Sequence, residues 1–154
     1  MPQPTEADPQ AWRRWLAMQA NNRGWDLSVQ ERTAAEDREM LDAAHASAWL
    51  WAPIGTELNR MRATMLLAEV TALVGDTSRA LVLASETRAY FLSHETPDWE
   101  IALTHVITAH CAAKAGEREL HREAFESAIA AIAKIAEAED RAIVEKTFAH
   151  VPVP

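Results

Sequence analysis

The sequence predicts an all-α fold, and three observations lead to this expectation. The chain of 154 residues is 49% hydrophobic but has only four glycines and few β-branched runs, which favours helix over strand. Apolar residues recur at the i, i+3, i+4 and i+7 spacing of amphipathic helices. The glycines and the internal prolines fall between these periodic segments, and the breaks are short. We therefore expect about seven antiparallel helices stacked as helical hairpins.

The length and the positions of the prolines predict one domain with short tails. Residues 1–7 are polar and rich in proline, as is typical of a flexible tail. Residues 8–151 form a single all-helical domain in this interpretation, and residues 152–154 form a second tail.

The first helix is expected to begin at Asp8-Pro9, an N-cap followed by a first-turn proline, and to end before Gly24. Residues 25–29 fit either a short helical turn or a connector. One face of the helix carries large apolar side chains: Trp12, Trp15 and Leu16.

The second helix has the clearest start signal, because Thr33 and Glu36 have the spacing of a capping box. It should run to about Ala52 and end at Pro53–Gly55. Its predicted buried stripe consists of Leu41, Ala44, His45, Ala48, Trp49 and Ala52. Trp51 lies beside this stripe.

The third helix, from a Thr56 cap to Val74, is apolar over most of its circumference, which predicts a central position. Its lone carboxylate, Glu69, has two interpretations. A buried carboxyl group would have a raised pKa and suit general acid–base chemistry. Alternatively, Glu69 pairs with an arginine of an adjacent helix or lies exposed on a narrow polar strip.

Four further helices complete the prediction. Gly75 ends the third helix and Gly116 ends the fifth, and the sixth helix starts at about Glu117. The predicted caps of the fourth, fifth and seventh helices are, respectively, Asp76 or Thr77, Thr96 ahead of Pro97, and Asp140.

Two of these hairpins resemble the tetratricopeptide repeat family over roughly residues 56–136. Small and large residues occur at the family's offsets in both hairpins: Ala68, Gly75 and Ala80 in one, and Ala109, Gly116, Phe125 and Ala128 in the next. The second hairpin departs from the family's pattern at His121, where an alanine is expected. The resemblance implies a superhelix of hairpins whose concave face binds peptides or partner proteins.

The chain also resembles a group of small, functionally uncharacterised bacterial all-helical proteins. This resemblance rests on residues 43–62 and on a C-terminal pattern of Glu139-Asp140-Arg141, Thr147-Phe148 and Val151-Pro152. The group often has a second histidine where this chain has Leu50, and the resemblance implies no activity.

The densest group of chemically versatile side chains surrounds the break between the second and third helices. Guanidinium groups, indoles and a helix N-terminus could together bind an anion. The alternative is a core histidine, tryptophans that pack, and arginines with structural partners. The candidate ligand- or partner-binding residues are His45, Trp49, Trp51, Asn59, Arg60, Arg62 and His105.

No motif for catalysis, a cofactor or a metal is recognisable. His105 and His110 are separated by about 140° of helix rotation, so they cannot chelate one ion together. The single cysteine, Cys111, lies within an apolar pattern that predicts a buried hydrophobe. We therefore expect no catalytic residue, no metal and no cofactor.

The net charge of −8 argues against a nucleic-acid partner, because phosphate binding needs a basic surface. No apolar run approaches the ~20 residues that span a bilayer, and the N-terminus lacks the basic and apolar segments of a signal peptide. These features predict a cytoplasmic protein without a membrane partner. Trp12 and Trp15, at one end of the stack, could cap it or pack on a second copy, and we favour a homodimer.

The functional expectation is a non-catalytic module that binds a protein or peptide through its concave helical face. The alternative is a small-molecule (anion) binding protein or a metal-assisted enzyme that uses the cluster of His45, Trp49 and Arg60.

Overall fold

The computed structural model describes residues 2–4 and 7–154, and within them the chain forms seven α-helices and no strand. The predicted tail of residues 1–7 therefore includes residues 1, 5 and 6, which lie outside the described part. The helices are α1 (Pro9–Ser28), α2 (Ala34–Trp51), α3 (Glu57–Leu73), α4 (Thr77–Phe91), α5 (Asp98–Ala115), α6 (Arg118–Ile132) and α7 (Ala138–Phe148).

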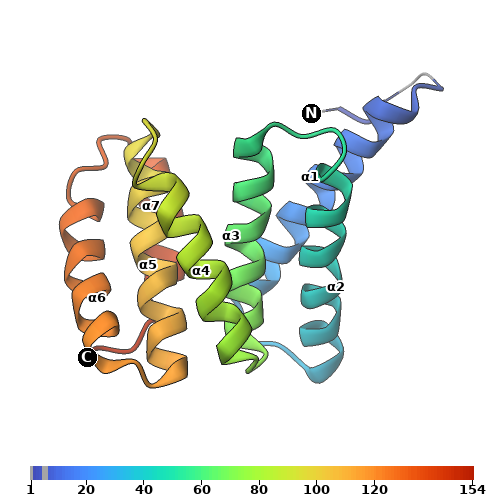
Figure 1. Ribbon diagram of the computed structural model, residues 1–154. Helices are drawn as coiled ribbons and strands as arrows, with labels where there is room; N and C mark the ends of the chain where they lie inside the picture. Colours follow the sequence, from blue (N-terminus) through green and yellow to red (C-terminus); the bar gives the residue numbers. More distant parts are fainter. Residues whose placement is uncertain (1, 5–6) are drawn as a thin grey trace.

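Helices that follow one another in the chain pack in neighbouring pairs, which confirms the all-α prediction. In Figure 1, α1 and α2 lie at one side of the molecule, α6 lies at the other, and α3, α4 and α5 lie between them. The odd-numbered helices also contact one another, since α3 packs on α1 and on α5, and α5 packs on α7. This arrangement buries α3 and α5 more than the other helices.

The local signals at most helix starts are confirmed. Asp8 accepts a hydrogen bond from the backbone of Gln10, and Thr33 and Glu36 form the predicted capping box. Thr56 caps α3 and Asp76 caps α4. Each cap satisfies backbone N–H groups that have no partner within the helix.

Two predicted caps are wrong. Pro97, rather than Thr96, is the N-cap residue of α5, and no side chain caps that helix. Glu137 precedes α7, so Asp140 lies in its first turn, where its negative charge complements the helix dipole.

The first helix does not end before Gly24 but continues to Ser28, so residues 25–28 extend the helix. Gly24 is buried against α3, where a β-carbon would lie 2.8 Å from Cδ2 of Leu66. The glycine therefore permits close packing of two helices instead of ending one of them. Gly75 and Gly116, in contrast, have positive φ angles of 93° and 78° and occupy turns as predicted.

The buried face of α2 is rotated from the predicted stripe. Trp51 is buried and packs with Ala17 of α1 and Ala63 of α3, whereas the side chain of Trp49 is 66% exposed. The two tryptophans are two residues apart, so about 200° of helix rotation separates them and only one can face the core.

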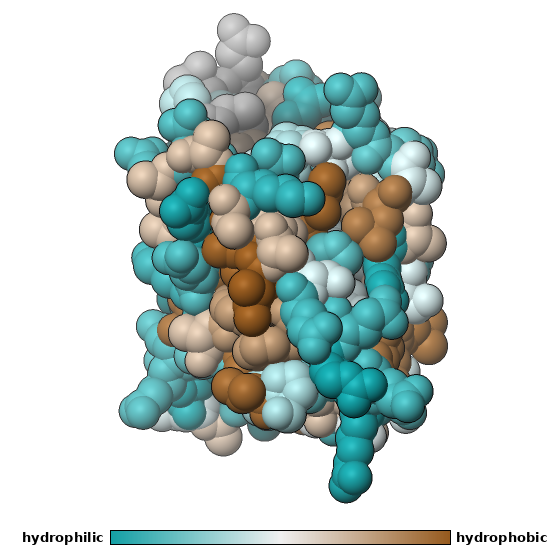
Figure 2. Space-filling model, turned by 90° about the vertical axis from the view of Figure 1, so that its left-hand side faces the viewer, coloured by the Kyte–Doolittle hydropathy of each residue, from teal (hydrophilic) through white to brown (hydrophobic). Residues whose placement is uncertain are grey.

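Apolar side chains are not confined to the interior. Figure 2 shows the side of the molecule on which α6 lies in Figure 1, with a band of apolar side chains among hydrophilic ones. Ile129 of α6 is 52% exposed. None of the described helices is long and apolar enough to cross a membrane.

Candidate functional site

Three of the predicted site residues belong to α2 and have different surroundings. His45 is partly buried, Trp51 lies in the core, and Trp49 lies at the surface. The guanidinium carbon of Arg13, on α1, lies 4.8 Å from the centre of the Trp49 ring, at the distance of a cation–π contact.

Asn59 and Arg60 make local contacts that stabilise the turn between α2 and α3. The side-chain oxygen of Asn59 accepts a hydrogen bond of 3.1 Å from the backbone N–H of Thr56 and completes a capping box. Arg60 donates a hydrogen bond of 2.7 Å from a terminal guanidinium nitrogen to the carbonyl of Gly55. These bonds give the amide and the first arginine a structural role at the helix start.

Arg62 reaches from α3 to the start of α5. Its Nε atom lies 2.5 Å from Oε1 of Glu100, a carboxylate with no exposed side-chain surface. Its guanidinium carbon lies 5.7 Å from the centre of the Trp99 ring. Arg62 therefore has the partner carboxylate that a positive charge near a helix N-terminus requires.

His105 lies on α5, close to charged groups of α4 and α6. Its Nδ1 atom is buried without a hydrogen-bond partner. Burial lowers the pKa of His105 below its ordinary value of 6.5, and the charge of Arg88 lowers it further, while Glu123 raises it. Arg88 itself forms an ion pair of 2.7 Å with Glu123.

The lowered pKa predicts that His105 makes the fold sensitive to acid. The unfolded chain binds a proton near pH 6.5 and the folded chain only at lower pH, so the stabilising contribution of neutral His105 is complete above pH 6.5 and is lost as the pH falls. In urea titrations between pH 7.5 and 5, His105→Gln should show a smaller decrease in unfolding free energy than the wild type. An identical decrease in both proteins would contradict this prediction.

No side-chain hydrogen bond, ion pair or ring contact joins two of the seven predicted site residues in the described part of the chain. His45 and Trp49 belong to α2, the asparagine and two arginines to α3, and His105 to α5. Their convergence on one ligand stays a prediction.

A buried polar pair lies where the sequence offered only single residues. A hydrogen bond of 2.7 Å joins Nδ1 of His110, on α5, to Oε1 of Glu69, on α3, and each side chain is only 1% exposed. The partner of Glu69 is thus a histidine instead of the expected arginine. The Cys111 thiol lies next to this pair, and burial, followed by the charge of Glu69, raises its pKa. A buried thiol of this kind is unreactive, which agrees with its predicted role as a small hydrophobe.

A cavity of about 610 Å³ lies between the C-terminal part of α1, the first turns of α5, and α7. No motif in the sequence predicts this cavity. Its lining combines two indoles with amide and charged groups: Asn21, Asn22, Trp25, Asp26, Val29, Trp99, Leu103, Asp140, Ile143, Lys146 and Thr147. The only signals in the sequence were the two tryptophans and the adjacent asparagines, and these residues come from three helices that are far apart in the chain.

The polar groups of this cavity are available to a ligand. No ion pair within residues 2–4 and 7–154 includes Asp26, Asp140 or Lys146. Asn22, Asp26 and Lys146 are exposed, while the ring of Trp99 is partly buried and the ring of Trp25 packs against the core. A concave, largely apolar surface with a few unpaired polar groups is typical of a binding site.

The described residues contain no group of three or more histidine, cysteine, aspartate or glutamate side chains that could hold a metal ion. Comparisons of the chain with protein-family models, with curated proteins and with solved structures find no match.

Proposed function

We propose that this chain is an interaction module that binds an extended peptide or protein segment in the cavity between α1, α5 and α7. The observation that carries the proposal is the cavity itself, with its two indoles and its unpaired polar groups. In this proposal the seven helices form antiparallel hairpins of a tetratricopeptide-like superhelix. In such a superhelix the first helix of each hairpin lines the concave face, and every helix that lines the cavity is odd-numbered.

The lining indicates what kind of segment would bind. Indole rings provide a large apolar contact area at a small cost in conformational entropy. The neighbouring amides of Asn21 and Asn22 can each donate to a peptide carbonyl and accept from a peptide N–H. The carboxylates of Asp26 and Asp140 favour a segment with a basic side chain beside an apolar one.

A selection from a random displayed-peptide library, followed by calorimetric titration of the enriched peptides, tests this function. We expect peptides with a basic residue next to an apolar one. Trp99→Ala should weaken their binding at least about tenfold, since the change removes an aromatic anchor. Asn22→Ala and Asp26→Asn, both at exposed positions, should weaken binding without changing the folding free energy by more than about 0.5 kcal/mol.

Trp49→Ala is the matched control, because it removes an exposed indole outside the cavity and should leave peptide affinity unchanged. If the enriched peptides bind the cavity variants as tightly as the wild type, the peptide-binding site lies outside the cavity. Failure to enrich any peptide would reject the interaction module in favour of the small-molecule alternative, for which the cavity volume lies within the usual range of about 300–1,000 Å³.

A further inference from the structure

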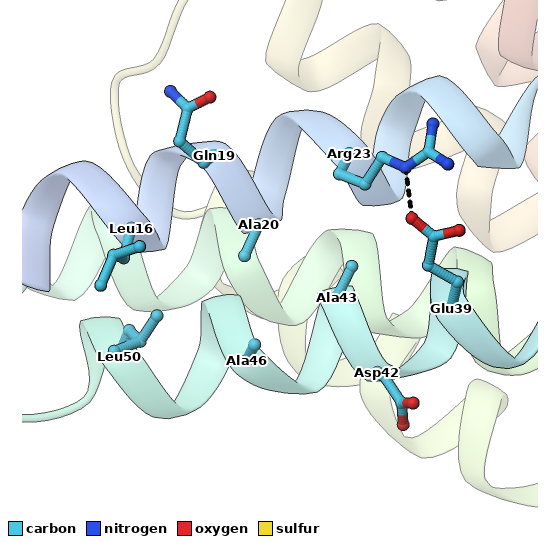
Figure 3. A pocket seen from close by; sticks show the side chains of 9 residues that line it. All are labelled: Leu16, Gln19, Ala20, Arg23, Glu39, Asp42, Ala43, Ala46 and Leu50. Carbon is cyan, nitrogen blue, oxygen red and sulfur yellow. Dashed lines mark hydrogen bonds and ion pairs between the residues drawn. The ribbon is translucent and has the colours of Figure 1, made fainter. Parts of the chain in front are cut away.

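The outer face of the α1–α2 pair is a shallow apolar groove that no other helix of the described chain covers. It is lined from one end to the other by Leu16, Gln19, Ala20, Arg23, Glu39, Asp42, Ala43, Ala46 and Leu50 (Figure 3). Leu16 is 44% exposed, and Trp49, adjacent to Leu50, is also exposed. The groove is separate from the cavity between α1, α5 and α7.

The two ends of the groove differ in charge. Leu16 and Leu50 lie at one end (Figure 3). Beyond the lining residues of that end, Arg13 precedes Leu16 by one turn of α1 and lies over the ring of Trp49, the neighbour of Leu50 in the chain. At the other end, Arg23 donates to Glu39 across 2.7 Å, and Asp42 has no ion-pair partner among the described residues. One end therefore carries a cation, and the other carries a net negative charge.

The middle of the groove is flat because its side chains are small. Ala20 of α1 faces Ala43 and Ala46 of α2 between the two charged ends (Figure 3). Small side chains allow two helix pairs to approach closely, and the leucines and Trp49 at one end supply apolar area.

From this distribution we infer that the groove is the interface of a homodimer with a two-fold axis at Ala20, Ala43 and Ala46. A two-fold axis that lies in the plane of the interface, at right angles to the length of the groove, places the Arg13 end of each copy on the Asp42 end of the other. An axis along the groove would instead oppose like charges, which is unfavourable. The sequence-based expectation of a dimer rested on Trp12 and Trp15, but these two rings pack edge to face on each other, 5.7 Å apart.

The apolar band on the α6 side offers a different mode of association. Contact between that band and the α1–α2 groove of the next copy would be head to tail and would build rings or open chains. The charged residues of α6 all lie between Arg118 and Glu126, where both signs are mixed, so they do not separate into a basic and an acidic end. The groove alone is therefore complementary to itself.

Sedimentation equilibrium over a range of concentrations tests this inference. We expect a dimer of the wild type. Ala46→Glu should give a folded monomer with an unchanged helical circular dichroism spectrum, because it places two carboxylates near the axis. Ala133→Glu, at an exposed position after α6, is the matched control and should remain dimeric.

A charge exchange makes the test specific for the orientation. R13E and D42R should each weaken the homodimer by about tenfold or more, since each opposes like charges twice. An equimolar mixture of R13E and D42R should restore dimerisation, because both contacts in the mixed dimer then join opposite charges. A wild type that is monomeric throughout, a mass that increases beyond the dimer, or a mixture no tighter than the single variants would overturn the inference. Since none of these residues lines the cavity, peptide binding tests the proposed function independently.

Discussion

His110→Leu should lower the unfolding free energy by about 3 kcal/mol, which we expect to be one of the two largest losses from a single side chain outside the apolar core. The substitution leaves the carboxyl group of Glu69 buried without its one hydrogen-bond partner, and the second oxygen of Glu69 already lacks one. Because the pair is inaccessible to water, solvent cannot replace the lost bond. Urea denaturation at pH 7 measures the loss.

The control is a double-mutant cycle at the same two positions. Glu69→Leu should also destabilise, because it leaves the imidazole unpaired. The double variant Glu69→Leu/His110→Leu replaces both polar groups with apolar ones and should be more stable than His110→Leu alone. Losses that simply add in the double variant would show that the two side chains are not coupled. In that case the hydrogen bond would not explain why two polar residues are buried here.

The features that could be predicted from the sequence depend on residues close together in the chain. A capping box needs two side chains three positions apart, so Thr33 with Glu36 was sufficient to locate the start of α2. The turns at Gly75 and Gly116 were equally local, since each needs one residue with a positive φ angle. Apolar periodicity then gave the number of helices.

The features that escaped prediction depend on contacts between helices. Gly24 predicts a helix end because a glycine lowers helix propensity, and the sequence does not reveal the approach of Leu66 that requires it. In α2, alanines surround the helix so evenly that the apolar pattern wrongly places Trp49 in the buried stripe, whereas Trp51 is the buried tryptophan. The Glu69–His110 pair joins residues 41 positions apart, and the cavity joins three helices.

Two arginines of α3, separated by Met61, provide the second large effect and its own control. Arg62→Leu should lower the unfolding free energy by about 3 kcal/mol, whereas Arg60→Leu should lower it by no more than about 1 kcal/mol. Arg62 neutralises a fully buried carboxylate on another helix. Arg60 is exposed and binds only a carbonyl of the preceding turn. Chemical denaturation of both variants in the same buffer gives the comparison.

The cost of losing Arg62 arises mainly from its partner. Arg62 is itself 41% exposed, so solvent screens its charge, but Glu100 has no exposed side-chain surface and would remain buried without a counter-ion. Glu100→Gln in the Arg62→Leu background should therefore recover part of the lost stability by removing the unpaired charge. If Arg62→Leu were as stable as the wild type, Glu100 would not depend on this partner. Arg62 would then be free to bind a ligand, as the anion-site interpretation of the sequence requires. A large loss with partial rescue would instead assign Arg62 to the packing of α3 on α5, and the cavity on α1, α5 and α7 would remain the better candidate site.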